Sequence, residues 1–468
     1  MFKYLNRGLS TPVAIGIIAV LVVVVGGGIL AYQYYYISKQ ETKSPTAEEN
    51  NLQTTKLFTI PEKHYLVFSS AISPIFSPDN KHFAYIVGSE RGKSFVILDG
   101  NEHKTYDYVD SGSLIFSSDN KHFAYIAANN IKWLYKADRP VGGEWWVVFD
   151  GVEQKEYQNI HSLIFSNDGK QIAYVASKPD SNKEFIVLNS KEQKNYDSIH
   201  SPIFSSNNSR FTYVVRQGGK EFLVLNGIEQ NNVYDRIKYL SFSSDGQQIA
   251  YVARKGSVGL KEVMGGVMLP YDAEFVVLNG VEQKQYENID EVHFHAGGKF
   301  TYRGFDGRRF FLVIDGKEYE NGRDPVFSQN NNHFAYVVIE KGENWSMVLD
   351  GVIQQYHGII SPMVFSADGK HYIYVVQPKG SIKEFVVVDG VAKPERDANI
   401  IFTSFSPSGK NFSYIAQQNN QKSLVILDEK ELSQYDKVWK PRFTKDGKHF
   451  IYNVFMGREL WLIVNSIE

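Results

Sequence analysis

One phrase of twelve residues recurs along this chain, and this repeat constrains the fold more than any other feature. IFSPDNKHFAYI at residues 75–86 returns as IFSSDNKHFAYI at 115–126 and as IFSNDGKQIAYV at 164–175. Weaker copies follow, and the leading phenylalanines of all copies are Phe76, Phe116, Phe165, Phe204, Phe242, Phe294, Phe327, Phe365, Phe405 and Phe443. Their spacing of 33 to 52 residues makes the chain an array of ten similar units.

Each unit reads as four β-strands. In the first unit the strand-like runs are residues 74–77, 82–87, 94–98 and 104–109, which alternate in polarity or are rich in β-forming residues. Turns such as Asp168-Gly169 join the first two runs, and turns such as Asp99-Gly100 join the last two. Asp-Gly suits a tight hairpin because both central positions need a positive φ. Four antiparallel strands in about 40 residues, repeated, predict an all-β chain of β-propeller blades.

The repeated phrase also indicates a family. FSPDNKHFAYI and FSADGKHYIYV, which begin at Phe76 and Phe365, resemble the WD40-like repeat of the TolB family, whose motif centres on FSPDG before an aromatic strand. The resemblance covers about residues 63–468 and implies a β-propeller of the kind found in bacterial envelope proteins. Some copies replace Asp-Gly by residues that tolerate the same turn, namely Asn207-Asn208, Gly297-Gly298 and Asn330-Asn331.

Ten four-stranded units predict one ring of ten blades. The last unit has only three strands, ending with residues 460–465, whereas an unassigned strand-like segment at residues 63–73 precedes the first unit. Phe68 in this segment stands eight residues before Phe76, the offset that the fourth-strand Tyr157 has to Phe165. The segment is therefore predicted to complete the last blade and cover its edge. Two rings of five blades are the alternative, because the sequence does not show the angles between blades.

The beginning of the chain has a different character from the repeats. Residues 13–32 read VAIGIIAVLVVVVGGGILAY, and no charged residue stands between Arg7 and Lys39. A helix of this length spans about 30 Å, the thickness of the bilayer core. A cleaved signal peptide is the alternative, but its apolar part usually has about 7–15 residues. Lys3 and Arg7 precede the segment, so the positive-inside rule keeps the N-terminus in the cytoplasm.

These features divide the chain into four predicted segments. They are a short cytoplasmic N-terminus at residues 1–11, a transmembrane anchor at 12–36, a flexible polar stalk at 37–60 and the propeller at 61–468. We therefore expect a single-pass protein of the cell membrane whose propeller is extracytoplasmic.

Composition and motifs argue against several kinds of chemistry. Lys+Arg 50 against Asp+Glu 52 leave a formal charge of −2, so no basic field favours nucleic acid. Cysteine is absent, which excludes disulfides and thiolate sites. No GxSxG, HExxH, GxGxxG or complete phosphate-loop motif occurs. The repeats also leave no room for the hydrolase domain of prolyl-oligopeptidase-type proteases. We expect no enzyme, no cofactor and no metal.

Histidines and glutamates recur at fixed repeat positions, which indicates structural roles. His82, His122, His333, His371 and His449 share a position beside the second strand, and His161 and His200 share one before the first. His293 and His295 face the same side of a strand, but no third zinc ligand is evident, and turn formation explains the aspartates without calcium. The repeated Glu153, Glu229 and Glu282 are read as solvated strand residues rather than paired catalytic acids.

Two units contain insertions between their second and third strands, at residues 129–144 and 255–272. Such connections lie on one rim of a propeller, and exposed Trp, Tyr and Met suit interfaces. The candidate partner-binding residues there are Trp133, Tyr135, Trp145, Trp146, Met264, Met268 and Tyr271. Ordinary loop variation is the alternative, in which the apolar residues of the second insertion fold back as a small helix.

The leading prediction is a membrane-anchored extracytoplasmic β-propeller that binds or scaffolds a protein, peptide or glycan on the insertion-bearing rim. One alternative is a propeller enzyme of the glycosidase or lyase type that acts on carbohydrate at the channel mouth. The other is a structural surface protein.

The predicted orientation has a direct test. Protease added to intact cells should remove the propeller and leave residues 1–36 in the membrane, detected with an antibody against an N-terminal tag. Protection of the propeller until the membrane is disrupted would show the inverted orientation. A mature N-terminus near Gln33 would show that the segment is cleaved.

Overall fold

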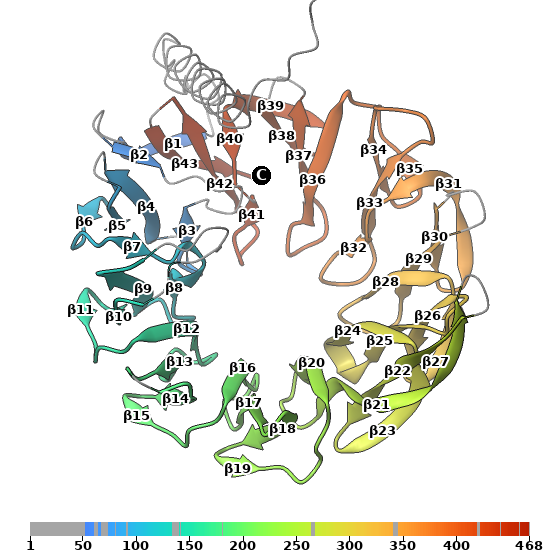
Figure 1. Ribbon diagram of the computed structural model, residues 1–468. Helices are drawn as coiled ribbons and strands as arrows, with labels where there is room; N and C mark the ends of the chain where they lie inside the picture. Colours follow the sequence, from blue (N-terminus) through green and yellow to red (C-terminus); the bar gives the residue numbers. More distant parts are fainter. Residues whose placement is uncertain are drawn as a thin grey trace, which may run out of the picture.

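The computed structural model describes residues 52–59, 64–66, 74–79, 81–89, 92–132, 140, 142–179, 181–263, 267–339, 345–418, 422–439, 441–457 and 459–467. These residues form antiparallel sheets arranged around one central opening (Figure 1). The prediction of an all-β propeller is confirmed. The predicted anchor at residues 12–36 lies outside the described residues, and within them no helix is long and apolar enough to cross a membrane.

The strands of the first five blades follow the repeats. Blade 1 contains β2 (His64–Leu66), β3 (Ile75–Phe76), β4 (Phe83–Ser89), β5 (Ser94–Leu98) and β6 (Asn101–Glu102). Blade 2 contains β7 (Tyr108–Val109), η1 (Ser111–Ser113), β8 (Ile115–Phe116), β9 (Phe123–Asn129), β10 (Glu144–Phe149) and β11 (Val152–Glu153). Blade 3 contains β12 (Asn159–Phe165), β13 (Ile172–Ser177), β14 (Glu184–Leu188) and β15 (Lys191–Glu192). Blade 4 contains β16 (Ser198–Phe204), β17 (Phe211–Gln217), β18 (Lys220–Leu225) and β19 (Ile228–Glu229), and blade 5 contains β20 (Arg236–Phe242), β21 (Ile249–Val263), β22 (Val267–Leu278) and β23 (Val281–Tyr286).

The second half continues in the same order. Blade 6 contains β24 (Asn288–Phe294), η2 (Ala296–Gly298), β25 (Phe300–Phe305), β26 (Phe310–Ile314) and β27 (Lys317–Glu320). Blade 7 contains β28 (Gly322–Phe327), β29 (Phe334–Ile339), β30 (Trp345–Leu349) and β31 (Val352–Ile360). Blade 8 contains the end of β31, β32 (Val364–Phe365), β33 (Tyr372–Gln377), β34 (Phe385–Val388) and β35 (Val391–Ala392). Blade 9 contains β36 (Ala398–Phe405), β37 (Phe412–Gln418), β38 (Ser423–Leu427) and β39 (Lys430–Tyr435), and blade 10 contains β40 (Lys437–Val438), β41 (Arg442–Phe443), β42 (His449–Met456), β43 (Glu459–Ser466) and β1 (Leu52–Thr59).

Blades 7 and 8 share one sheet, so the described chain has nine sheets for ten units. β31 pairs with β30 as the fourth strand of blade 7, and its last residues pair with β33 as the first strand of blade 8. All sheets border the same opening in Figure 1. The arrangement is therefore one ring, and the alternative of two five-bladed rings is wrong.

Paired tyrosines fill the space between blades. The fourth-strand tyrosine of one blade meets the second-strand tyrosine of the next, as in Tyr157 and Tyr174, whose ring centroids are 6.2 Å apart. Tyr234 and Tyr251 form the same contact at 5.9 Å. Both members of each pair are buried. The repeated tyrosines of the sequence are thus the shared core of neighbouring blades.

The ring is closed by an N-terminal strand, but not by the predicted one. β1 pairs with β43 in antiparallel fashion along its length and becomes the outermost strand of blade 10. Leu57 packs with Leu460 against a core that contains Phe83 of blade 1, so the last and first blades are in contact. The prediction that an N-terminal strand completes the last blade is therefore confirmed, although the strand is Leu52–Thr59.

Two segment assignments need correction. The stalk predicted at residues 37–60 includes Leu52–Thr59, which is a strand because it completes the hydrogen bonds of β43. The segment 63–73, predicted as the closing strand, instead contributes His64–Leu66 as an inner strand that pairs with β4 of blade 1, and Phe68 lies outside the described residues. A third correction is local: the fourth strand of blade 1 starts at Asn101–Glu102, because the hairpin turn at Asp99 and Gly100 (φ 50° and 82°) brings the chain back at once. Of the predicted run 104–109, Tyr106 does pair with Ser94 of the third strand, whereas Tyr108–Val109 belong to blade 2.

Candidate functional site

The structure places only part of the predicted partner-binding surface. Trp133, Tyr135 and Met264 lie outside the described residues. Met268 and Tyr271 lie on β22, but their side chains are outside the described set. Both insertions do connect second and third strands, β9 to β10 and β21 to β22.

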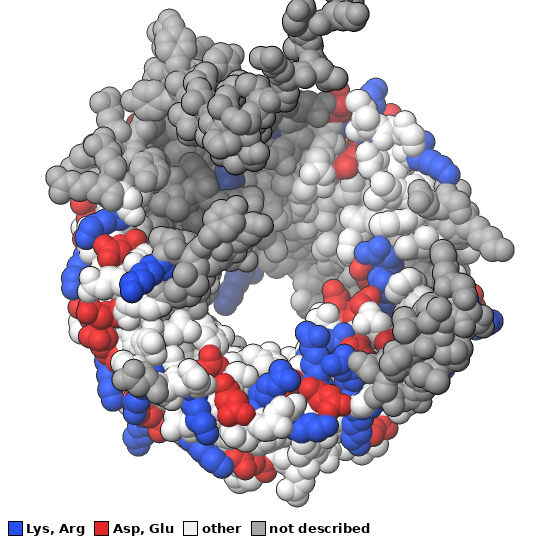
Figure 2. Space-filling model, in the orientation of Figure 1, with Lys and Arg blue, Asp and Glu red and all other residues white. Residues whose placement is uncertain are grey.

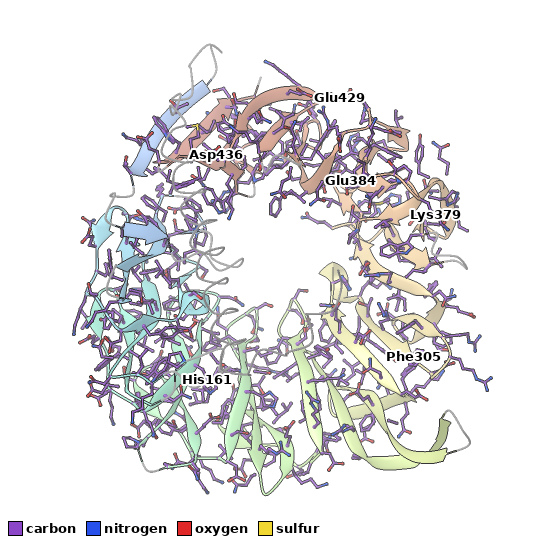
Figure 3. All side chains as sticks on the ribbon, turned by 45° about the horizontal axis from the view of Figure 1, so that its top comes forward. His161, Phe305, Lys379, Glu384, Glu429 and Asp436 are labelled. Carbon is purple, nitrogen blue, oxygen red and sulfur yellow. The ribbon has the colours of Figure 1, made fainter. Side chains whose placement is uncertain are left out.

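The second insertion is a long hairpin rather than a helix. β21 and β22 pair from Ala250 and Leu278 as far as Val263 and Val267. Figures 1 and 3 show this ribbon extending beyond the neighbouring hairpins. The alternative in which the insertion folds back as a small helix is therefore wrong for the strand-forming residues.

Trp145 and Trp146 belong to the cores between blades and not to an exposed rim. Trp145 is 1% exposed, lies in the core shared by blades 2 and 3, and donates from Nε1 to the Gly142 carbonyl oxygen at 2.7 Å. Trp146 is half-buried against the core of blades 1 and 2. Adjacent strand residues point to opposite faces of a sheet, so the two indoles face the two neighbouring blades. Trp145 as a partner-binding residue is a wrong prediction.

The repeated histidines have the structural role that the sequence indicated. The imidazole Nδ1 lies 2.7 Å from the carboxylate Oδ2 of the aspartate in the second hairpin turn, in the pairs His82–Asp99, His122–Asp150, His333–Asp350 and His371–Asp389. The other oxygen of Asp99 accepts from the Phe83 backbone N–H at 2.9 Å. These pairs tie the two turns together in blades 1, 2, 7 and 8.

A second set of polar contacts joins consecutive blades. A glutamate in or directly before the third strand accepts from the backbone N–H of an isoleucine in the first strand of the next blade, in the pairs Glu184–Ile199, Glu221–Ile237, Glu274–Ile289 and Glu384–Ile400. His161 and His200, which share a repeat position, lie beside Glu184 and Glu221; His161 and Glu384 are labelled in Figure 3. Two of the glutamates predicted to be solvated are ion-paired between blades, Glu153 with Lys104 and Glu229 with Lys194, each at 2.7 Å. Glu282 pairs with Lys255 of its own blade. Each of these residues thus has a structural partner.

The described residues contain no cluster of three or more potential metal ligands. His293 and His295 do face each other, with ring centroids 6.2 Å apart, but His295 Nε2 lies 2.7 Å from the Thr301 hydroxyl and His293 Nε2 lies 3.0 Å from Glu291. Burial lowers the pKa of His295 to about 4.

In Figure 2, basic and acidic side chains alternate around the described part of this face.

A cavity of about 680 Å³ lies where blades 9, 10 and 1 meet, and we call it the seam cavity. Six of its fourteen lining residues lie on the inner strands β36, β40, β41 and β3, and the others lie on adjoining loops or on β37, β38 and β42 (Figure 1). The lining residues are Pro74, Phe76, Ser77, Pro78, Ile401, Phe402, Gln417, Ser423, Lys437, Val438, Trp439, Pro441, Arg442 and Asn453. An apolar cavity of this size with a few polar groups is typical of a ligand site.

Three polar groups in this lining lack their usual partners within the described residues. Arg442 donates from Nη1 to the Pro78 carbonyl oxygen at 3.3 Å and has no ion pair. Burial lowers the pKa of the Arg442 guanidinium, which Asp79 partly offsets. The Trp439 indole nitrogen and the Asn453 side-chain oxygen are buried without a hydrogen-bond partner. A buried donor or acceptor without a partner costs about 1–3 kcal/mol, so the hydrogen-bonding capacity of these groups is unused within the described residues.

Comparisons with known proteins are consistent with the fold alone. No family model and no curated protein matches the sequence. Among solved structures, "Crystal structure of the eukaryotic initiation factor" is 10% identical and covers 83% of this chain and 89% of that one, with a TM-score of 0.44. The β-propeller domain of the Trilobed protease from Pyrococcus furiosus is 14% identical and covers 61% of this chain and 96% of that one, with a TM-score of 0.29. Both scores are low, so the propeller assignment rests on the ring of sheets itself.

The inter-blade glutamates predict an acid-sensitive contribution to stability. Burial would raise the pKa of Glu221, but hydrogen bonds from His200 and the Ile237 backbone outweigh it, and the pKa is lowered. A lowered pKa means that this contribution is complete above the pKa of the unfolded chain and is lost as the pH falls through the folded value. Glu221→Ala should therefore lower the free energy of unfolding by about 1.5–3 kcal/mol at pH 7.

Urea denaturation at pH 7 and below pH 4 measures this effect. The difference in free energy of unfolding between Glu221→Ala and the unmodified protein should be smaller at the acidic pH. Glu429→Ala, which removes an exposed ion pair with Lys393, is the matched control and should cost less than about 1 kcal/mol. Equal losses in the two variants would contradict the structural role of Glu221.

Proposed function

We propose that this chain is a membrane-anchored, extracytoplasmic β-propeller that binds a protein, peptide or glycan. The seam cavity carries the proposal, because it combines a preformed apolar lining with a half-buried guanidinium that has no ion pair among the described residues. Membrane attachment and orientation rest on residues 1–36 of the sequence, and the resemblance to TolB-like repeats agrees with an envelope location.

Binding fits the described surfaces better than catalysis does. The buried or half-buried glutamates at the blade junctions accept backbone hydrogen bonds, and the repeated turn aspartates hold histidines or turns. These contacts account for the carboxylates that a carbohydrate-cleaving enzyme would need as a pair. The insertion-bearing rim, with Trp133, Tyr135, Met264, Met268 and Tyr271, remains a second predicted partner surface on the same molecule.

The seam cavity can be tested without changing the fold. Phe402 is 43% exposed at φ 56°, a backbone conformation that Asn tolerates. The full chain, purified in a mild detergent, is used as bait for components of the cell envelope, alongside the double variant Phe402→Asn, Arg442→Gln. Loss of two anchors should reduce the retained partner by at least about tenfold.

The matched control is Val352→Asn, which changes an apolar side chain of 64% exposure in a different blade. It should retain as much partner as the unmodified protein. Equal retention by all three proteins would contradict a role for the seam cavity in binding.

A further inference from the structure

The hairpin turns of blades 3, 4 and 5 differ chemically from those of blades 1, 2, 7 and 8. The latter carry the His–Asp pairs described above. At the same two repeat positions, blades 3, 4 and 5 carry Gln171 with Asn189, Arg210 with Asn226, and Gln248 with Asn279. These three consecutive blades therefore carry a neutral amide at the turn position where blades 1, 2, 7 and 8 carry a carboxylate.

The exchange leaves the hairpins intact. The side-chain oxygen of Asn226 accepts from the Phe211 backbone N–H at 2.8 Å, and that of Asn279 accepts from the Ile249 backbone N–H at 2.9 Å. Asp99 makes the same bond in blade 1. Only the second branch of the side chain differs, where an NH₂ donor replaces a carboxylate oxygen. In Asn226 this donor reaches the Ser209 carbonyl oxygen only at 3.5 Å, which is a weak contact.

Two clefts lie beside these turns. The cleft between blades 3 and 4 has a volume of about 310 Å³, and the cleft between blades 4 and 5 has about 480 Å³. The same repeat positions line both, namely Gln171 and Arg210, Gln193 and Gln230, Tyr213 and Tyr251, and Asn226 and Asn279. No Asp or Glu of the described chain lines either cleft. They are two copies of one amide-lined site.

We propose that each amide-lined cleft binds one sugar residue of a neutral oligosaccharide. Sugar hydroxyls both donate and accept hydrogen bonds, and the side-chain amides of Asn and Gln do the same. A carboxylate in this position would only accept, and its desolvation by an uncharged ligand would be costly. Phe204 and Phe211, whose ring centroids are 4.6 Å apart, line the first cleft. Phe211 is buried, so the half-buried Phe204 is the ring that offers apolar surface to the C–H face of a sugar.

Arg210 is the charged side chain in the lining of the two clefts, and its position favours hydrogen bonding to hydroxyl groups over binding of an anion. Arg210 lines both clefts, and its Nη1 donates to the Gln247 carbonyl oxygen at 2.8 Å. The guanidinium is thus positioned between the clefts as a donor to hydroxyl groups. Two equivalent clefts one repeat apart also favour an extended ligand, because the second contact is then intramolecular.

The inference is independent of the seam cavity, because the two clefts share no lining residue with it and the cleft variants leave every seam residue in place. The full chain in mild detergent is applied to an array of neutral and acidic oligosaccharides, and affinity for a neutral binder is then measured by calorimetry. Asn226→Asp with Asn279→Asp should weaken this affinity at least tenfold. The fold should persist, because Asp occupies the same position in other blades and keeps the bond to the backbone.

Asp350→Asn makes the reverse exchange in blade 7 and should leave oligosaccharide binding unchanged. A second pair, Gln193→Ala with Gln230→Ala, leaves the turn residues in place and should also weaken binding. Unchanged affinity in both cleft variants, binding to acidic oligosaccharides only, or no binding to any neutral oligosaccharide would overturn the proposal.

Discussion

Aromatic packing between neighbouring blades is the interaction on which this ring depends. A four-stranded sheet has two apolar faces and cannot bury them alone, so each blade is stable only against its neighbours. The tyrosine pairs, such as Tyr435 and Tyr452 at 5.9 Å between blades 9 and 10, fill that contact at successive junctions. A ring of such contacts has no free face only when the last blade meets the first. β1 and the core around Leu460 and Phe83 supply that junction.

The repeat made most of the fold predictable. The phrase that begins at Phe76 contains a hairpin turn and a strand with a core tyrosine, and β5 lies at residues 94–98 as predicted. The closing strand was missed because Leu52–Thr59 reads LQTTKLFT, which is polar and has no counterpart in the repeats. Its strand character comes from the unsatisfied edge of β43, a tertiary effect that local sequence does not encode. The offset of Phe68 correctly indicated that an N-terminal strand closes the ring, but the strand that does so is Leu52–Thr59.

Functional residues were less predictable, and the reasons are physical. Aromatic residues next to an insertion suggested exposure, yet Trp145 follows the two-residue period of β10 into a core. The seam cavity is formed by residues far apart in sequence, such as Phe76 and Arg442, and only ring closure brings them together. The amide-lined clefts did leave a signal. It was the replacement of histidine and aspartate by Gln171, Asn189 and their equivalents, a departure from the repeat rather than the repeat itself.

Ring closure by β1 is the central claim, and a cross-link tests it most directly because the chain has no cysteine of its own. Thr55 faces Leu462 in the antiparallel register of β1 and β43, close enough for a disulfide between Cys side chains. The double variant Thr55→Cys, Leu462→Cys should therefore oxidise to a cross-linked species, detected by mass spectrometry, while the protein remains folded. A cross-link formed by Phe68→Cys with Leu462→Cys, and none by the first pair, would contradict the account.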